Sequence, residues 1–102
     1  MQLDGRAEYR VPLELSIQLA RPGLPYEAEI AVLTNVSERG AQAATKVKWS
    51  AGEEVRINSL SNSLHVPARV AYCRREQEQG FSVGLLLLSP RDKWWESFRD
   101  GA

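Results

Sequence analysis

Two short segments of the chain combine residue types that bind phosphates and nucleobases. Arg6 and Arg10 lie four residues apart in RAEYR, and NVSERG places Asn35, Ser37 and Gly40 within six residues. Guanidinium groups bind phosphates and stack on bases, amides bond base edges, and hydroxyls bond phosphate oxygens. Glycine allows a turn or the close approach of a ligand. These residues therefore indicate a binding site for a small anionic ligand.

Each segment is a weak signal when it is taken alone. Two arginines four residues apart are expected by chance in a chain with ten arginines. The pattern N-x-S-x-x-G also fits a structural turn held by side-chain-to-backbone hydrogen bonds. Arg39, inside this segment, is a weaker candidate for ligand contact. Pro12 disfavours a helical conformation at Val11, so the two arginines are expected on an extended arm.

The composition argues against several functions. The 13 Lys and Arg residues balance the 13 Asp and Glu residues, so the chain lacks the positive charge that duplex nucleic acid or an anionic membrane surface requires. Its longest apolar run, residues 83–88, is too short to span a bilayer. With one His and one Cys, the chain cannot build a Cys/His zinc site, and a Ser-His-Asp triad would have to use His65. We therefore expect neither a metal site nor an enzyme.

The cysteine content indicates the compartment. The single Cys73 cannot form an internal disulfide and fits a reducing environment. The first ten residues contain no apolar signal segment. We therefore expect a cytoplasmic protein.

Alternation of apolar and polar residues dominates the rest of the chain and is typical of half-buried β-strands. It starts at Val11, and turn-forming residues such as Gly23 and Gly52 separate the alternating segments. Six strands are predicted, at about residues 11–20, 26–32, 41–46, 55–59, 64–73 and 81–88. Six short antiparallel strands favour a small closed barrel, because closure removes exposed sheet edges.

The same alternation predicts which side chains face the core. In the second strand, Ile30 and Val32 are expected on the apolar face and Glu29 on the opposite face. The last strand is apolar at both parities, which predicts burial on both faces. Gly84 in this strand is a second weaker site candidate, because it could leave room for a base. Residues 35–40 interrupt the alternation and are expected to form a tight loop.

A helix is predicted after the last strand. Ser89 and Pro90 form a helix-start signal, and about ten residues should follow as far as Arg99. Trp94, Trp95 and Phe98 are expected to pack this helix on the barrel, with one of the two adjacent tryptophans exposed. The predicted fold is therefore an all-β, six-stranded antiparallel barrel with one short C-terminal helix. We expect residues 1–102 to form a single domain with a flexible ligand-binding arm (1–10), a barrel (11–88) and a helix (89–100).

Taken in order, the two motifs resemble the PilZ family, bacterial domains that bind the second messenger cyclic di-GMP. The family pattern is R-x-x-x-R ahead of the first strand, followed by D/N-x-S-x-x-G between the second and third strands. Here these are RAEYR and NVSERG. The later segments GEEVRI and VPARVAYCRREQEQGFSVGLLL also resemble strands of the family, so the resemblance covers nearly the whole chain. It implies the same six-stranded barrel with a C-terminal helix.

The resemblance also implies roles for individual residues. Arg6 and Arg10 would bind phosphates and contact guanine. Asn35 would bond a guanine edge, Ser37 would meet the ligand backbone, and Gly40 would permit the loop.

Two departures from the family pattern concern the arm. Gly5 stands where many members have another arginine, and the arm is short. Both features would weaken ligand binding.

The resulting hypothesis is a non-catalytic receptor for cyclic di-GMP that needs no cofactor. Ordering of residues 1–10 on binding would present a new surface to an unidentified protein effector. The protein would be a monomer or a weak homo-oligomer. The alternative is a nucleotide-independent protein–protein interaction module of the same fold, acting through a surface such as the helix tryptophans. An oligonucleotide-binding barrel is disfavoured by the zero net charge.

Overall fold

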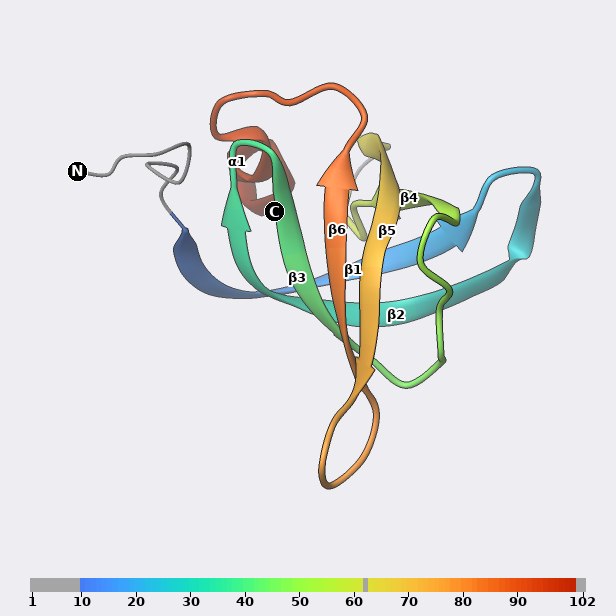
Figure 1. The fold of residues 1–102 in the computed structure, drawn as a ribbon. Helices are drawn as coiled ribbons and strands as arrows, with labels where there is room; N and C mark the ends of the chain where they lie inside the picture. Colours follow the sequence, from blue (N-terminus) through green and yellow to red (C-terminus); the bar gives the residue numbers. More distant parts are fainter. Residues whose placement is uncertain (1–9, 62, 101–102) are drawn as a thin grey trace.

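The computed structural model describes residues 10–61 and 63–100 and shows a closed barrel of antiparallel strands with one helix (Figure 1). The strand order around the barrel is β1-β2-β3-β6-β5-β4. The predicted fold class, an all-β six-stranded antiparallel barrel with a short C-terminal helix, is confirmed. The elements are β1 (Val11–Arg21), β2 (Leu24–Ser37), β3 (Gly40–Thr45), β4 (Glu54–Asn58), β5 (His65–Arg75), β6 (Phe81–Leu87) and α1 (Trp94–Asp100).

The strands are paired to very different extents. β1 pairs with β2 along most of its length, whereas its pairing with β4 covers only residues 18–20 and 56–58. We call this short pairing the β1–β4 seam. The side-chain amide of Asn58 donates a 3.0 Å hydrogen bond to Gln18 Oε1 across it. This seam closes the barrel.

Alternation in β1 places its apolar side chains inside the barrel, as predicted. Ile17 and Leu19 are fully buried, while Glu14 and Ser16 are exposed. The other strands, the β3–β4 connection and α1 contribute the remaining core residues. The largest fully buried side chains are Trp49, Ile17, Leu19, Leu33, Ile57, Val36, Val55, Val70 and Val83.

The predicted faces of β2 are wrong. Ala31 and Leu33 are buried, whereas Ile30 is 57% exposed. Residues 30–33 are all apolar, so alternation alone does not determine which pair faces inward. Glu29 shares the parity of the inward-facing residues, and its carboxylate is satisfied there by a hydrogen bond from the buried indole of Trp49.

The prediction that β6 is buried on both faces is also wrong. Leu85 and Leu87 are buried, but Leu86 is 52% exposed and Leu88, just after the strand, is 46% exposed. Only the inner face of a closed barrel lies in its core. The outer face of β6 therefore carries the exposed Leu86, and the exposed Leu88 follows directly after the strand.

The segment predicted as a loop at residues 35–40 is mostly strand. β2 continues to Ser37, β3 begins at Gly40, and only Glu38 and Arg39 form the turn. The interruption in the alternation has another cause, a register shift between β2 and β3 at Leu33/Asn35. A bulge of this kind changes which side chains face outward.

The C-terminal helix is shorter than predicted and begins later. α1 starts at Trp94 rather than near Pro90, because Lys93 has a positive φ of 52° that interrupts helical geometry. The segment before it is held to the β2–β3 turn by a 3.2 Å bond from Arg91 N to Glu38 O. Among the described residues, no helix is long and apolar enough to cross a membrane.

The expectation that one helix tryptophan is exposed is wrong. Trp94, Trp95 and Phe98 are 3%, 7% and 4% exposed, and all three belong to the core cluster. The rings of Trp94 and Trp95 pack edge to face with centroids 6.0 Å apart. One short helix therefore inserts three aromatic side chains into the barrel.

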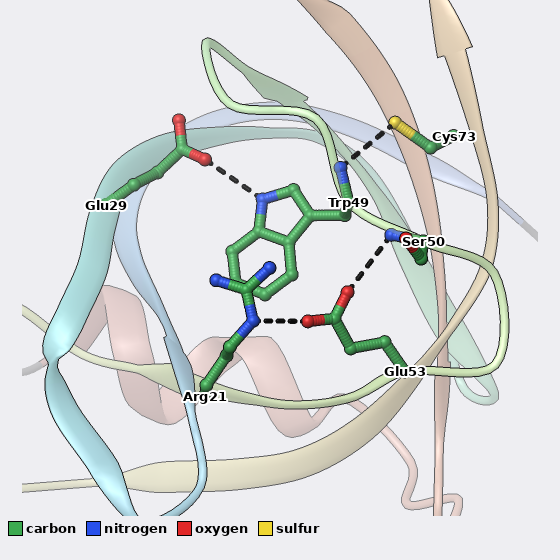
Figure 2. Close-up of polar contacts among 6 residues, drawn as sticks. All are labelled: Arg21, Glu29, Trp49, Ser50, Glu53 and Cys73. Carbon is green, nitrogen blue, oxygen red and sulfur yellow. Dashed lines mark hydrogen bonds and ion pairs between the residues drawn. The ribbon is translucent and has the colours of Figure 1, made fainter.

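The connection between β3 and β4 is fixed by a buried tryptophan (Figure 2). The Trp49 indole N–H donates to Glu29 Oε1 at 2.9 Å, and its backbone N–H donates to Cys73 Sγ at 3.4 Å. The guanidinium carbon of Arg21 lies 4.5 Å from the indole centroid, and this arginine pairs with Glu53. Glu53 also accepts a 3.0 Å bond from Ser50 N, so the cluster ties four segments together.

Candidate ligand-binding site

Arg10 and Asn35 lie in direct contact at the start of β1. The Arg10 Nη1 donates a 2.6 Å hydrogen bond to Asn35 Oδ1, across 25 residues of sequence. The pairing of Pro12 with Asn35 places the end of the arm beside this part of β2. Arg10 is exposed and Asn35 is half-buried, so both groups are available at the surface. Arg6, the other arginine of the motif, lies outside the described residues.

The amide of Asn35 continues into a chain of hydrogen bonds across the outside of the barrel. Asn35 Nδ2 donates to Gln42 Oε1 at 2.7 Å, and Gln42 Nε2 donates to Ser82 Oγ at 2.7 Å. We call these four residues, Arg10, Asn35, Gln42 and Ser82, the outer relay. Sequence reasoning missed Gln42 and Ser82. The alternation in the third strand could have placed Gln42 on the outer face. Its hydrogen-bond partners, however, depend on the register between strands.

The same outer surface extends to an aromatic ring on β5. Gly84 pairs with Gln42 on one side and with Tyr72 on the other. A Cβ on Gly84 would lie 2.2 Å from Tyr72 Cε2. The Tyr72 ring therefore occupies the space beside Gly84, and the expected room for a base is absent there. The Arg74 guanidinium carbon lies 4.7 Å from the centroid of this ring.

Residues from four adjacent strands thus form one row. Asn35 on β2, Gln42 on β3, Gly84 on β6 and Tyr72 on β5 are successive register partners. Three strand spacings correspond to about 14 Å, which is wider than a single nucleobase. With Arg10 at one end, the row offers a guanidinium group, side-chain amides and an exposed aromatic ring. Such a surface can bind a phosphate, bond a base edge and stack a base.

Ser37 and Gly40 have a different environment from the outer relay. Ser37 is 0% exposed, and its backbone carbonyl accepts a 2.8 Å bond from Trp94 Nε1. A Cβ on Gly40 would lie 2.0 Å from the backbone oxygen of Leu85, so β3 and β6 can approach here only with glycine. The structure therefore requires Gly40 for strand packing, and it buries Ser37 below the hairpin end. Ligand contact by either residue stays a prediction.

Arg39 lies in the two-residue turn between β2 and β3. Its side chain is exposed, and its backbone carbonyl accepts a 2.8 Å bond from Leu87 N. The turn is thereby attached to the end of β6. A ligand-binding role for Arg39 stays a prediction.

The described residues offer the chemistry of binding. Among them, no group of three or more His, Cys, Asp or Glu side chains could hold a metal ion. The outer relay and the ring of Tyr72 together offer a guanidinium, two amides, a hydroxyl and an aromatic ring. These groups suit recognition of a nucleotide by hydrogen bonds and stacking.

Comparison with known protein families identifies the family to which the chain belongs. The PilZ domain profile matches residues 4–93, which include both sequence motifs and all six strands. A comparison with curated proteins gave no match. The family match covers most of the chain, and the barrel brings an arginine of the first motif onto the asparagine of the second. The chain therefore belongs to the PilZ domain family, whose members are generally non-catalytic receptors for cyclic di-GMP.

Proposed function

We propose that this domain is a non-catalytic, cytoplasmic receptor for cyclic di-GMP. The observation that carries this proposal is the 2.6 Å contact between Arg10 and Asn35, which joins the two motifs on the outside of the barrel. The contact occupies one N–H group of Arg10, and a guanidinium has five. Donors therefore remain for ligand phosphates.

The contacts that the ligand would make follow from the chemistry of the outer relay and of Tyr72. Arg10 would bind a phosphate by charge-assisted hydrogen bonds. Asn35 Oδ1 would accept a bond from the N–H groups of a guanine edge. The ring of Tyr72 would offer a stacking surface for a base once the guanidinium of Arg74, which now lies over it, moves aside. Ser37 and Arg39 are secondary candidates for contacts near the hairpin end.

Signalling would use the N-terminal arm. Arg6 and Arg10 would gain phosphate contacts together, which would offset the conformational entropy lost when residues 1–10 become ordered. The ordered arm would then form part of a surface for a protein effector. The receptor would act as a monomer or weak homo-oligomer, and no metal or cofactor enters this mechanism.

Calorimetric titration with cyclic di-GMP tests the proposal, with GTP and the linear dinucleotide pGpG as controls. We expect saturable heat with cyclic di-GMP and much weaker binding of both controls. Absence of heat with cyclic di-GMP at high micromolar concentration contradicts the receptor function.

A nucleotide-independent interaction module is the second candidate. The observation that favours it is a pair of exposed leucines, Leu86 on the outside of β6 and Leu88 directly after the strand. The helix tryptophans cannot supply that surface because they are buried. If the titration is silent, Leu86→Ser should abolish binding to a captured protein partner without lowering the melting temperature.

A further inference from the structure

The outer relay has a single possible direction. Arginine donates hydrogen bonds and cannot accept them. Arg10 therefore requires that Asn35 present its oxygen, as observed at 2.6 Å. The amide nitrogen of Asn35 then faces Gln42 Oε1, and the Gln42 nitrogen faces Ser82 Oγ, both at 2.7 Å. The two amides are consequently locked in one orientation from end to end.

From this geometry we infer that Gln42 is a positioning residue that holds the oxygen of Asn35 toward the ligand. The inference rests on the proposed function and adds a specificity-determining residue to that site. Asn35 alone could rotate its amide by half a turn and present N–H groups instead. With Gln42 in its observed orientation, that rotation would set the Asn35 oxygen against the Gln42 oxygen, and the bond from Arg10, which can only donate, opposes a joint rotation of the two amides.

The orientation of the Asn35 amide matters because hydrogen-bond donors of guanine must face acceptors of the protein. The Watson–Crick edge of guanine presents N–H donors at N1 and N2, which need an acceptor. Asn35 Oδ1 is such an acceptor, and the bond to Arg10 uses only one of its two lone pairs. Because a guanidinium has five N–H groups, Arg10 can keep its bond to Asn35 while its other N–H groups bind a phosphate, and the orientation of the relay is then retained.

An aspartate at position 35 provides the sharpest test. A carboxylate presents oxygen in either orientation, so it has no orientation for Gln42 to fix. We measure the Kd for cyclic di-GMP of four proteins: wild type, Gln42→Leu, Asn35→Asp and the double variant. Gln42→Leu should weaken binding about 3- to 10-fold when residue 35 is Asn. In the Asn35→Asp background, Gln42→Leu should raise the Kd by less than about twofold.

The chain contains a matched control pair. Asn58 donates to Gln18 Oε1 at 3.0 Å across the β1–β4 seam, so Gln18→Leu removes the same kind of amide–amide bond elsewhere on the barrel. It should leave the Kd for cyclic di-GMP unchanged. Melting temperatures of all variants separate loss of folding from loss of positioning.

Two results overturn the positioning role. One is an equal loss of affinity from Gln42→Leu in both backgrounds, which is the result that a purely structural role predicts. The other is loss of binding in Asn35→Asp alone, which would show that the ligand needs the amide nitrogen.

A measurement without ligand separates this inference from the proposed function. NMR exchange of the Asn35 side-chain amide protons should be slow in wild type and faster in Gln42→Leu, because the bond to Gln42 protects them. Equal exchange in the two proteins overturns the relay itself. Slow exchange combined with no binding of cyclic di-GMP by wild type would instead contradict the receptor function and, with it, the guanine preference.

Discussion

Trp94 on α1 donates its indole N–H to the backbone carbonyl of Ser37 at 2.8 Å, although 57 residues separate them. The bond is buried, and it attaches the C-terminal helix to the last residue of β2. Ser37 is also the serine of the second family motif. The motif and the helix are therefore mechanically connected through one hydrogen bond.

Trp94→Phe should lower the free energy of unfolding by about 1–3 kcal/mol, because the buried carbonyl of Ser37 loses its donor. Urea denaturation measures the loss. Trp95→Phe is the control, since it removes a similar volume from the same helix without touching Ser37. Equal losses in the two variants would show that packing, rather than the bond, determines the effect.

Arg10→Ala should weaken cyclic di-GMP binding by about one to two orders of magnitude, the size expected for loss of a charge-assisted contact. Arg10 is exposed, so the melting temperature should change little. Calorimetry gives the affinity. Arg56→Ala, an exposed arginine on β4, is the charge-matched control and should bind normally. Similar losses in both variants would indicate a general effect of net charge.

Gly40→Ala and Gly84→Ala should both lower the free energy of unfolding, but a second substitution should remove the loss only at Gly84. At Gly40 the added Cβ meets the backbone of Leu85, so we expect a loss of at least about 1–3 kcal/mol. At Gly84 it meets the Tyr72 ring, which can move because it is on the surface. In a Tyr72→Ala background, Gly84→Ala should therefore cost little. Denaturation of the single and double variants checks this, and an undiminished cost would place the clash elsewhere.

Glu29→Gln should destabilise the β3–β4 connection. Its carboxylate accepts bonds from Trp49 Nε1 at 2.9 Å and Lys46 N at 2.7 Å, one on each oxygen. An amide has only one accepting oxygen, so one of these donors loses its partner, at about 1–3 kcal/mol. Glu54→Gln is the control, because its ion pair with Arg69 is exposed and contributes little. Equal stabilities of the two variants would contradict this role of Glu29.

The sequence was sufficient to predict the barrel, because alternation in β1 and β5 reports one buried face. It was insufficient for β2, where residues 30–33 are apolar at both parities. There, Glu29 on the inward parity is satisfied by Trp49, which comes from a different part of the chain. The buried face of a strand can be predicted from the local sequence only where apolar residues occupy one of its two faces.

The candidate site shows the same division. The motifs pointed to Arg10 and Asn35, and the structure brings the two together. Gln42 and Tyr72 were missed because their place in the row depends on the register of four strands. The motif explained Gly40 by a turn or by the close approach of a ligand, whereas the structure requires glycine there because of the backbone of Leu85. Contacts across strands require three-dimensional information.

The β1–β4 seam determines how the barrel opens. It is the shortest of the strand pairings described. Its partners are 36 to 40 positions apart in the sequence, so closing it during folding costs a large loop entropy. Transient rupture of the seam would convert a closed cylinder into an open sheet with two unpaired edges. Amide hydrogens of residues 18–20 and 56–58 should therefore exchange through a lower-energy opening than those of β3 and β6. Any self-association of partly unfolded protein should begin at these two edges.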